Sequence, residues 1–459
     1  MKNLNRRHFL KSVSAWGAAL AMPLTSTTAQ EESCGHWYRG NLHMHTQWSD
    51  GKLLPECAVA WYKDRGYNFI CTSDHGTFQT DEFRFSGWCG SCEPPRDLSP
   101  FEGETSRWKR VVNSNNWAQL NQEHMDQCRE KFGPDSVKTK TVEGQTFCRL
   151  TPFDELDQRF TEPGKFLLIP GFEQTGNCKD KYQVHMNFIN VRSCFPYRAE
   201  ENSKKTVDAN FHYGQKFFKE NREPFIFTLN HPISSFYDVD PRILIDNADI
   251  RFFEFNNNPL AYPKLAFGWT PDTYWDLINA YRVTAGQQLL LATGTDDEHT
   301  YTREEPRAWM VVRAKELTFP ALFQAMNQGD FYTSNGLDFD DIAFDRNSGT
   351  LSVKVKPLDG RKVRIDFLGT RKEADLTITE VEVPAKDKQP ARTIPTWSPE
   401  VGRVFQSSEG LEASYTLQSG DLYVRARVTT VDEVQQFQDK EPIIPQPGAW
   451  TQPWSLLVR

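Results

Sequence analysis

Short apolar segments that each lead into a histidine or an acid recur through the first two thirds of this chain. Residues 37–43 read as a strand, 53–66 as a helix that stops at a glycine, and 67–73 as the next strand. Further strands are predicted at 165–173, 182–191, 224–231, 250–255, 288–299 and 308–313, and a helix at 318–328. Ionisable residues at the ends of such strands are typical of α/β barrels, which place their chemistry there.

Six of the ten histidines and three acids occupy these strand ends. They are His43, His45, Asp50, His75, Glu173, His185, His231, Asp297 and His299. In the HxH motif the two imidazoles point to the same face, because side chains alternate along a strand. A single histidine at a strand end is most often a hydrogen-bonded structural residue. So many buried imidazoles and carboxylates in one place are costly without a cation, and the pattern therefore predicts a metal centre.

Two acids are adjacent in the segment GTDDEH. Asp297 is the predicted ligand because the Asp-x-His spacing puts it on the same face as His299, which leaves Asp296 to support the ligands. The other side chains predicted to orient ligands are Asn230, Glu254 and Asn256.

The order of these motifs, HxH, SDG, DH, GxE, H, NHP and GTxDxH, resembles the PHP family (polymerase and histidinol phosphatase). The resemblance covers about residues 36–335. It implies a distorted seven-stranded β/α barrel with a cluster of two or three divalent metal ions at its carboxyl-terminal face. Residues 308–336 and 449–459 look like the exported branch that includes carbaryl-hydrolase-like metallohydrolases.

Carried over position by position, the resemblance implies three metal sub-sites. His43, His45 and Asp297 hold the first metal, and His185 and His231 hold the second, with Glu173 as the bridging ligand. Asp50, His75 and His299 hold the third, and Asp50 stands where many relatives carry a histidine. Amidohydrolases also begin with HxH, but they usually bridge their metals with a carbamylated lysine and would leave His75 and His299 unused, so the PHP pattern fits better.

A water that bridges two divalent ions becomes hydroxide near neutral pH, and the ions polarise the substrate oxygen. Ligation by nitrogen and oxygen suits Zn, Mn or Fe. We therefore expect a metal-dependent hydrolase of a small molecule, with a phosphomonoester or phosphodiester favoured. One alternative is an aryl carbamate, ester or amide hydrolase with the same metals, and another is a non-catalytic metal-containing binding protein. The sequence leaves the oligomeric state open.

Arg303 and Arg307 follow the last ligands and are candidate clamps for an anionic substrate group. Solvated loop charge is the alternative reading of both arginines.

Residues 1–30 are predicted to be an export signal. Arg6 and Arg7 precede an apolar stretch at 12–24, which indicates a twin-arginine signal, with an ordinary secretory signal as the alternative. No segment reaches the roughly 18 apolar residues that a membrane span needs. Loss of residues 1–30 would remove four basic and no acidic residues and change the formal net charge from −8 to −12, which argues against nucleic acid as a partner. We expect a periplasmic or secreted protein.

All nine cysteines lie between Cys34 and Cys194, and their odd number leaves at least one free thiol. Cys57 and Cys71 are predicted to be buried thiols. The remaining cysteines of interest are Cys89, Cys92, Cys128 and Cys148. We expect them to form disulfides that pin an insertion, and a zinc knot is the alternative.

Residues 80–160 interrupt the alternating pattern. This insertion is predicted to fold over the barrel mouth and to contribute Trp88 or Trp108 to the substrate pocket. From 336 to 459 the chain becomes β-rich, which predicts an appended β-sandwich. That part contains no histidine or cysteine, so we expect it to supply no metal ligand.

Overall fold

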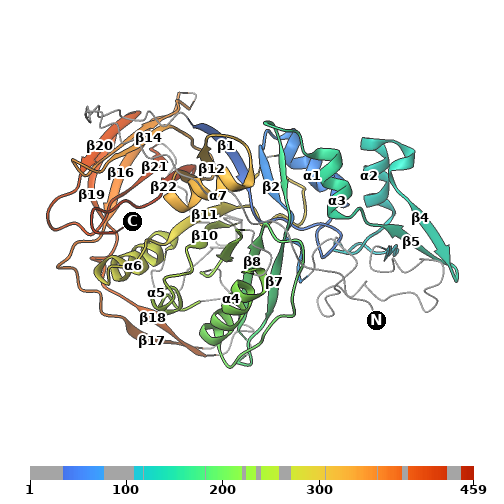
Figure 1. Cartoon of the computed structure of the whole chain (residues 1–459), viewed down its shortest axis with the longest axis horizontal. Helices are drawn as coiled ribbons and strands as arrows, with labels where there is room; N and C mark the ends of the chain where they lie inside the picture. Colours follow the sequence, from blue (N-terminus) through green and yellow to red (C-terminus); the bar gives the residue numbers. More distant parts are fainter. Residues whose placement is uncertain are drawn as a thin grey trace, which may run out of the picture. The chain divides into compact units, whose positions relative to one another are not determined.

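In the computed structural model, all described residues lie between positions 35 and 458. The described residues are 35–76, 108–116, 118–180, 182–219, 224–233, 239–257, 270–304, 306–358, 360–384, 391–431 and 446–458. The expected export signal, Trp88 and the cysteines at 34, 89 and 92 lie outside them. The described secondary structure is a mixture of helices and strands (Figure 1). Within it, no helix has the length and apolar character needed to cross a membrane.

Two sheets build the region that carries the predicted ligands. One contains, in order, β6 (Leu167–Ile169), β2 (Phe69–Cys71), β1 (His36–Asn41), β12 (Trp309–Ala314) and β13 (Phe331–Ser334). The other contains β7 (Gly171–Asn177), β8 (Gln183–Ile189), β9 (Ile226–Leu229), β10 (Phe252–Asn257) and β11 (Leu291–Thr295). Strands β1, β2 and β6 run parallel, as do β9, β10 and β11, whereas β8 is antiparallel to both β7 and β9.

The expected seven-stranded barrel is not closed in the described residues, because the strands form two separate ladders. The chain passes from one ladder to the other at Pro170, which has no backbone N–H to continue a strand. The two sheets still share one apolar core, to which Phe69 and Phe252 contribute from opposite sheets. Isolated bridges join them at the strand ends, between Met44 and Glu298 and between His75 and Glu173.

Helices cover the outer face of the five-stranded sheet. They include α4 (Ser203–Lys219), α5 (Arg242–Asp246) and α6 (Pro271–Thr284), and Figure 1 shows α4 beside β7 and β8. In β8, Met186 and Phe188 share a buried cluster with Phe211 of α4. Because neighbouring side chains of a strand point to opposite faces, His185 and Asn187 are directed toward the interior. The same alternation in β7 directs Glu173 inward.

The other helices of the ligand-bearing region accompany the nine-stranded sheet. They are α1 (Pro55–Asp64), α3 (Phe153–Phe160) and α7 (Phe319–Gln328). Helix α7 ends at Gly329, whose φ of 80° is a left-handed conformation that glycine adopts without strain.

The nine-stranded sheet continues into the β-rich part of the chain. Beyond β13 it contains β22 (Gly448–Thr451), β21 (Arg425–Thr430), β16 (Val363–Gly369) and β19 (Arg403–Glu409). A three-stranded sheet of β14 (Phe339–Asp345), β15 (Thr350–Val355) and β20 (Glu412–Thr416) shares a buried apolar cluster with β16 and β21. The strands β17 (Thr379–Val383) and β18 (Arg392–Thr396) pair separately. The boundary expected at residue 336 is thus crossed by a continuous sheet.

The described part of the insertion contains α2 (Gln122–Phe132), a 3-10 turn at Pro134–Ser136, and a sheet of β3 (Trp108–Arg110), β5 (Gln145–Arg149) and β4 (Thr139–Val142). Figure 1 shows α2, β4 and β5 together at one edge of the molecule. Its apolar side packs against Trp48 and Leu54, which precede α1.

Among the described cysteines, Cys57, Cys71, Cys128, Cys148 and Cys178 are free thiols. Cys57 and Cys71 are buried, as expected. The disulfides expected for Cys128 and Cys148 are not formed. Both side chains instead belong to the apolar cluster between α1 and the insertion, where a thiol packs as a small hydrophobic group.

Candidate metal centre

The loop of residues 43–50, which follows β1, is held in place by two charged side chains. Asp74, at the end of β2, accepts hydrogen bonds from the backbone N–H and the hydroxyl of Thr46 at 2.7 and 2.8 Å. Lys109 of β3 donates to two carbonyls of the loop at 2.9 and 2.8 Å. Lys109 is 3% exposed, so the insertion supports the ligand-bearing loop from within the protein.

All nine predicted ligands lie together. They come from the loops after β1, β2, β9 and β11 and from the interior faces of β7 and β8. The side chains of Asp50, Asp297 and His299 are 17, 18 and 21% exposed, whereas those of the other six are 7% exposed or less. The cluster therefore opens toward Asp50, Asp297 and His299.

The first group of ligand atoms surrounds the HxH motif. Nε2 of His43 lies 3.1 Å from Nε2 of His45. Both nitrogens face Oδ1 of Asp297, at 3.2 and 3.0 Å respectively. Oε1 of Glu173 is 3.2 Å from Nε2 of His43. These four side chains are those that the resemblance assigns to the first metal together with its bridging carboxylate.

Glu173 lies at the centre of the cluster. Besides contacting His43, its Oε1 is 3.2 Å from Nδ1 of His185 and 3.7 Å from Nε2 of His231. Its Oε2 is 2.6 Å from Nδ1 of His75 and 3.7 Å from Nε2 of His45. One carboxylate thus faces the imidazoles of all three expected sub-sites.

The third group surrounds Asp50. Its Oδ1 lies 3.4 Å from Nε2 of His75 and 3.4 Å from Nε2 of His299. Ligand atoms within 4.8 Å of one another form three overlapping groups: His43–His45–Glu173, His75–Glu173–His185 and His45–Asp50–His75–His299. His75 therefore joins the second and third groups. Its Nδ1 is also 2.6 Å from the hydroxyl of Thr175, which leaves Nε2 facing Asp50.

The spacing of these atoms fits metal coordination. Ligands bound tetrahedrally at 2.0–2.2 Å from a metal are separated from one another by roughly 3.3–3.6 Å. The separations of His43, His45, Glu173 and Asp297 fall close to this range, between 3.0 and 3.7 Å. Nitrogen and carboxylate oxygen donors without thiolate suit Zn, Mn or Fe.

The electrostatics also favour a cation. Burial by itself raises the pKa of Glu173, but the surrounding imidazoles outweigh it and hold that pKa well below its ordinary value. Burial lowers the pKa of His45 to about 3 and that of His185 to about 4. Burial also lowers the pKa of His299, but Asp297 and Asp50 outweigh this and raise it to about 10. The site therefore combines ionised carboxylates with both neutral and protonated imidazoles, and binding of a divalent ion would release the protons of those imidazoles.

Two of the three side chains expected to orient ligands form hydrogen bonds with predicted ligands. Glu254 of β10 accepts a hydrogen bond from Nδ1 of His43 at 2.7 Å and one from the backbone N–H of His231 at 3.1 Å. Asn230 donates to Glu173 at 2.8 Å. The amide of Asn256 instead donates to a threonine hydroxyl of β13 at 3.4 Å.

Two ligand positions have a strained backbone. His231 and Asp297 have φ values of 29° and 48°, which are uncommon for residues with a side chain. Such strain persists only where the surrounding structure enforces it, and it concentrates at functional sites.

Asp296 and Asp297 point to different environments, and Asp297 is the one that faces the imidazoles of His43 and His45. Asp296 accepts hydrogen bonds from the backbone N–H groups of Arg307 and Ala308 at 2.7 and 2.8 Å. It thereby anchors the segment that leads into β12. Among the described contacts, none joins the guanidinium of Arg303 or Arg307 to the ligand cluster.

The insertion reaches the ligand-bearing loop but is not shown to contact the ligands. Besides the Lys109 contacts, the indole N–H of Trp48 donates to the carbonyl of Thr151 at 3.0 Å. Trp108 stacks with Lys140, whose Nζ is 4.9 Å from the ring centroid. The expected contribution of aromatic side chains to a substrate pocket stays a prediction.

Sequence reasoning missed Ser49, Asp74 and Lys109. Asp74 had a signal, because it precedes His75 in the DH motif. Ser49 and Lys109 have roles that only tertiary contacts reveal.

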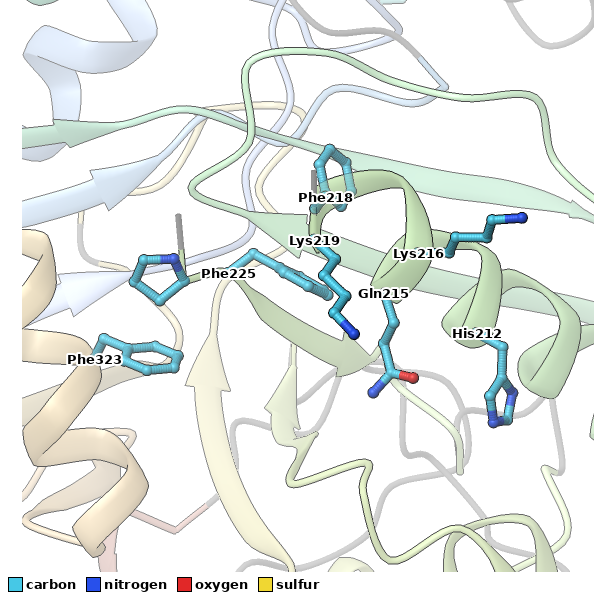
Figure 2. Close-up of a pocket in the computed structure, with 8 residues that line it drawn as sticks. His212, Gln215, Lys216, Phe218, Lys219, Phe225 and Phe323 are labelled. Atoms are coloured by element: carbon cyan, nitrogen blue, oxygen red, sulfur yellow. The ribbon is translucent and has the colours of Figure 1, made fainter. Parts of the chain in front are cut away.

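A separate concavity of about 630 Å³ lies away from the cluster. Its lining residues come from α4, the start of β9 and α7 (Figure 2): His212, Gln215, Lys216, Phe218, Lys219, Pro224, Phe225 and Phe323. Strand β9 begins next to Phe225 and leads to His231 at its other end. The concavity and the ligand cluster are therefore at opposite ends of this strand.

Comparison with known proteins gives little beyond this geometry. No protein-family model and no curated protein matches the chain. Among solved structures it is similar to a two-domain protein from Bacteroides vulgatus that contains a predicted PHP-like metal-dependent phosphoesterase. The identity is 13%, the TM-score is 0.36, and the match covers 87% of this chain and 91% of that one. At this identity and TM-score, the match assigns no function to the chain.

Proposed function

We propose that this chain is a metal-dependent hydrolase of the PHP type and that its nine clustered side chains hold two or three divalent ions. The observation that carries the proposal is the arrangement of ligand atoms around Glu173. Its two oxygens face five imidazoles at 2.6–3.7 Å, and all six of these side chains are buried.

The residues would divide the work as the resemblance implies. His43, His45 and Asp297 would hold the first ion, His185 and His231 the second, and Asp50, His75 and His299 the third, with Glu173 shared by the first two. Bound ions would lower the pKa of a bound water and polarise an oxygen of the substrate.

The exposure of the ligands favours one direction of approach for a substrate. Among the nine described ligands, Asp50, Asp297 and His299 are the most exposed, so the scissile group would enter on their side. We propose a small phosphomonoester or phosphodiester, because several closely spaced cations suit an anionic group with more than one oxygen. Arg303 and Arg307 follow these ligands in the chain and stay candidate clamps for an anionic substrate group. To act as clamps, their side chains would have to move toward the ligand cluster when a substrate binds.

The resemblance of residues 308–336 and 449–459 to the exported branch favours an aryl carbamate, ester or amide as the second candidate substrate. Protein loaded with Zn, Mn or Fe should be assayed with p-nitrophenyl phosphate, bis-p-nitrophenyl phosphate and naphthyl carbamates. We expect turnover of a phosphate ester that needs metal. Turnover of the carbamates alone would transfer the assignment to the second candidate.

A matched pair of variants separates the cluster from histidines in general. His185→Ala should abolish turnover, whereas His212→Ala, which removes an exposed histidine of α4, should leave it unchanged. Full metal occupancy without turnover of any ester would instead indicate a non-catalytic binding protein. Export through the twin-arginine signal is part of the same proposal and is tested by locating the protein in fractionated cells.

A further inference from the structure

We propose that Asp74, acting through the hydroxyl of Ser49, is a positioning residue that holds His45 in the one tautomer able to bind a metal through Nε2. The inference rests on the proposed function, because it takes His45 as a ligand. Asp74 is fully buried and Ser49 is 4% exposed, so water does not compete for their hydrogen bonds.

The hydroxyl of Ser49 links the other two side chains. Its Oγ donates to Oδ1 of Asp74 at 2.6 Å and lies 3.3 Å from Nδ1 of His45. An ionised carboxylate can only accept, so the single hydroxyl proton of Ser49 points to Asp74. The same oxygen can then only accept from His45. Nδ1 of His45 therefore carries the proton, and Nε2 keeps the lone pair.

The other described contacts around His45 favour the same tautomer. Asp50 Oδ1 lies 3.8 Å from Nδ1 of His45, which is too far for a hydrogen bond. Asp74 itself cannot turn away, because its two oxygens also accept from the backbone and the hydroxyl of Thr46. The lone pair of Nε2 points toward Asp297, 3.0 Å away.

The two histidines of the HxH motif are thus oriented by different devices. Nδ1 of His43 donates directly to Glu254, at 2.7 Å. Nδ1 of His45 reaches its carboxylate only through a hydroxyl. Partners of this kind fix the tautomer and the ring orientation of a ligand, and their loss costs metal affinity.

Removal of the hydroxyl tests the proposal. Zn²⁺ affinity of the full-length protein is measured by competition with a chromophoric chelator. Ser49→Ala should weaken it about 10- to 100-fold, and Ser49→Thr, which keeps a hydroxyl, should restore most of it. Gln47→Leu is the matched control, because Gln47 is buried in the same loop and its described side-chain hydrogen bonds go to the carbonyl of Lys52 and to His124, which are not predicted ligands.

A double-mutant cycle tests whether Asp74 acts through Ser49. Asp74→Ala should weaken Zn²⁺ binding about as much as Ser49→Ala, and the double variant should be little weaker than either. In Co²⁺-loaded protein, the exchangeable ring N–H resonance of His45 should be sharp in the wild type and broadened by solvent exchange in Ser49→Ala. A structural role alone would leave this resonance in place.

The outcomes are distinguishable. If the wild type binds none of Zn²⁺, Mn²⁺ and Fe²⁺, both the proposed function and this inference are wrong. If the wild type binds Zn²⁺ and Ser49→Ala binds it equally well, only the positioning role is wrong. Equal weakening by Gln47→Leu would assign the effect to packing of the loop and would also overturn the inference.

Discussion

Two clusters of buried charge lie in the described part of this chain, and they are satisfied in different ways. Between α6 and β21, Arg425 donates to Asp276 at 2.9 and 2.6 Å and lies 2.7 Å from Asp272. Tyr423 donates to the same Asp276 at 2.8 Å. Burial lowers the pKa of Arg425, but the two carboxylates outweigh it and hold that pKa above its ordinary value.

In the ligand cluster, nitrogen atoms that can act as hydrogen-bond acceptors face one another, and such contacts are not hydrogen bonds. Nε2 of His43 and Nε2 of His45 face each other at 3.1 Å, although Nδ1 of each is within reach of a hydrogen-bond acceptor. Two lone pairs this close repel unless a cation lies between them. The carboxylates of Asp272 and Asp276 are compensated by the guanidinium of Arg425. The carboxylates and imidazoles of the ligand cluster instead need a bound cation.

The largest effect is expected for Glu173→Gln. The substitution keeps the size of the side chain but replaces the shared carboxylate with one neutral oxygen and an amide that cannot bind metal. It should lower kcat by orders of magnitude and reduce occupancy of the His185 and His231 site. Steady-state kinetics and metal analysis of the purified variant measure both. Two metals retained with near-native turnover would show that Glu173 is only a buried acid held by hydrogen bonds.

Asp276→Asn should affect the other cluster and spare the metal. Removing one partner of a buried ion pair leaves Arg425 under-compensated, and the expected loss of unfolding free energy is about 3 kcal/mol. Urea unfolding measures this loss, and metal analysis should give the wild-type content. Loss of metal from the folded variant would contradict the separation of the two clusters.

Glu254→Gln should give an intermediate effect. Each carboxylate oxygen of Glu254 accepts two hydrogen bonds. Oε1 accepts from His43 and Thr295, and Oε2 accepts from His231 and Asn257. A glutamine amide in either orientation places an NH₂ group against two donors. We expect metal affinity to fall about 10- to 100-fold. Unchanged affinity in a chelator competition would mean that Glu254 does not orient the ligands.

The smallest effect is expected for His299→Ala. His299 is the most exposed of the nine and contacts Asp50 and Asp297 at the open edge. Its loss should remove at most the third ion and reduce kcat less than Glu173→Gln does. Titration of the variant with Zn²⁺ should still show the sites that share Glu173. A complete loss of bound metal would show that the third group is not separable from the others.

Much of this centre follows from the sequence because its ligands either follow an apolar strand or lie on the interior face of one. HxH, DH and GFE each lie within or directly after an apolar run. Their positions on or after strands can therefore be predicted from the local sequence alone. The alternation of Phe172 with Glu173, and of Met186 with His185, already separates the packed face from the interior.

The rest depends on tertiary contacts. The open ladder at Pro170 and the sheet that passes residue 336 arise from pairing between distant strands, such as β13 with β22. The support given by Lys109 joins residues about 60 positions apart along the chain. The disulfides expected for Cys128 and Cys148 gave way to apolar packing, which cysteine counting does not predict.

The most direct test of the metal centre is anomalous diffraction from crystals of the reconstituted full-length protein, collected at the absorption edges of Zn, Mn and Fe. We expect two or three anomalous peaks within coordination distance of Glu173 and its neighbouring imidazoles, and none near Arg425 and Asp276. A cluster without any anomalous peak, in protein that elemental analysis shows to be free of metal after reconstitution, would contradict the assignment.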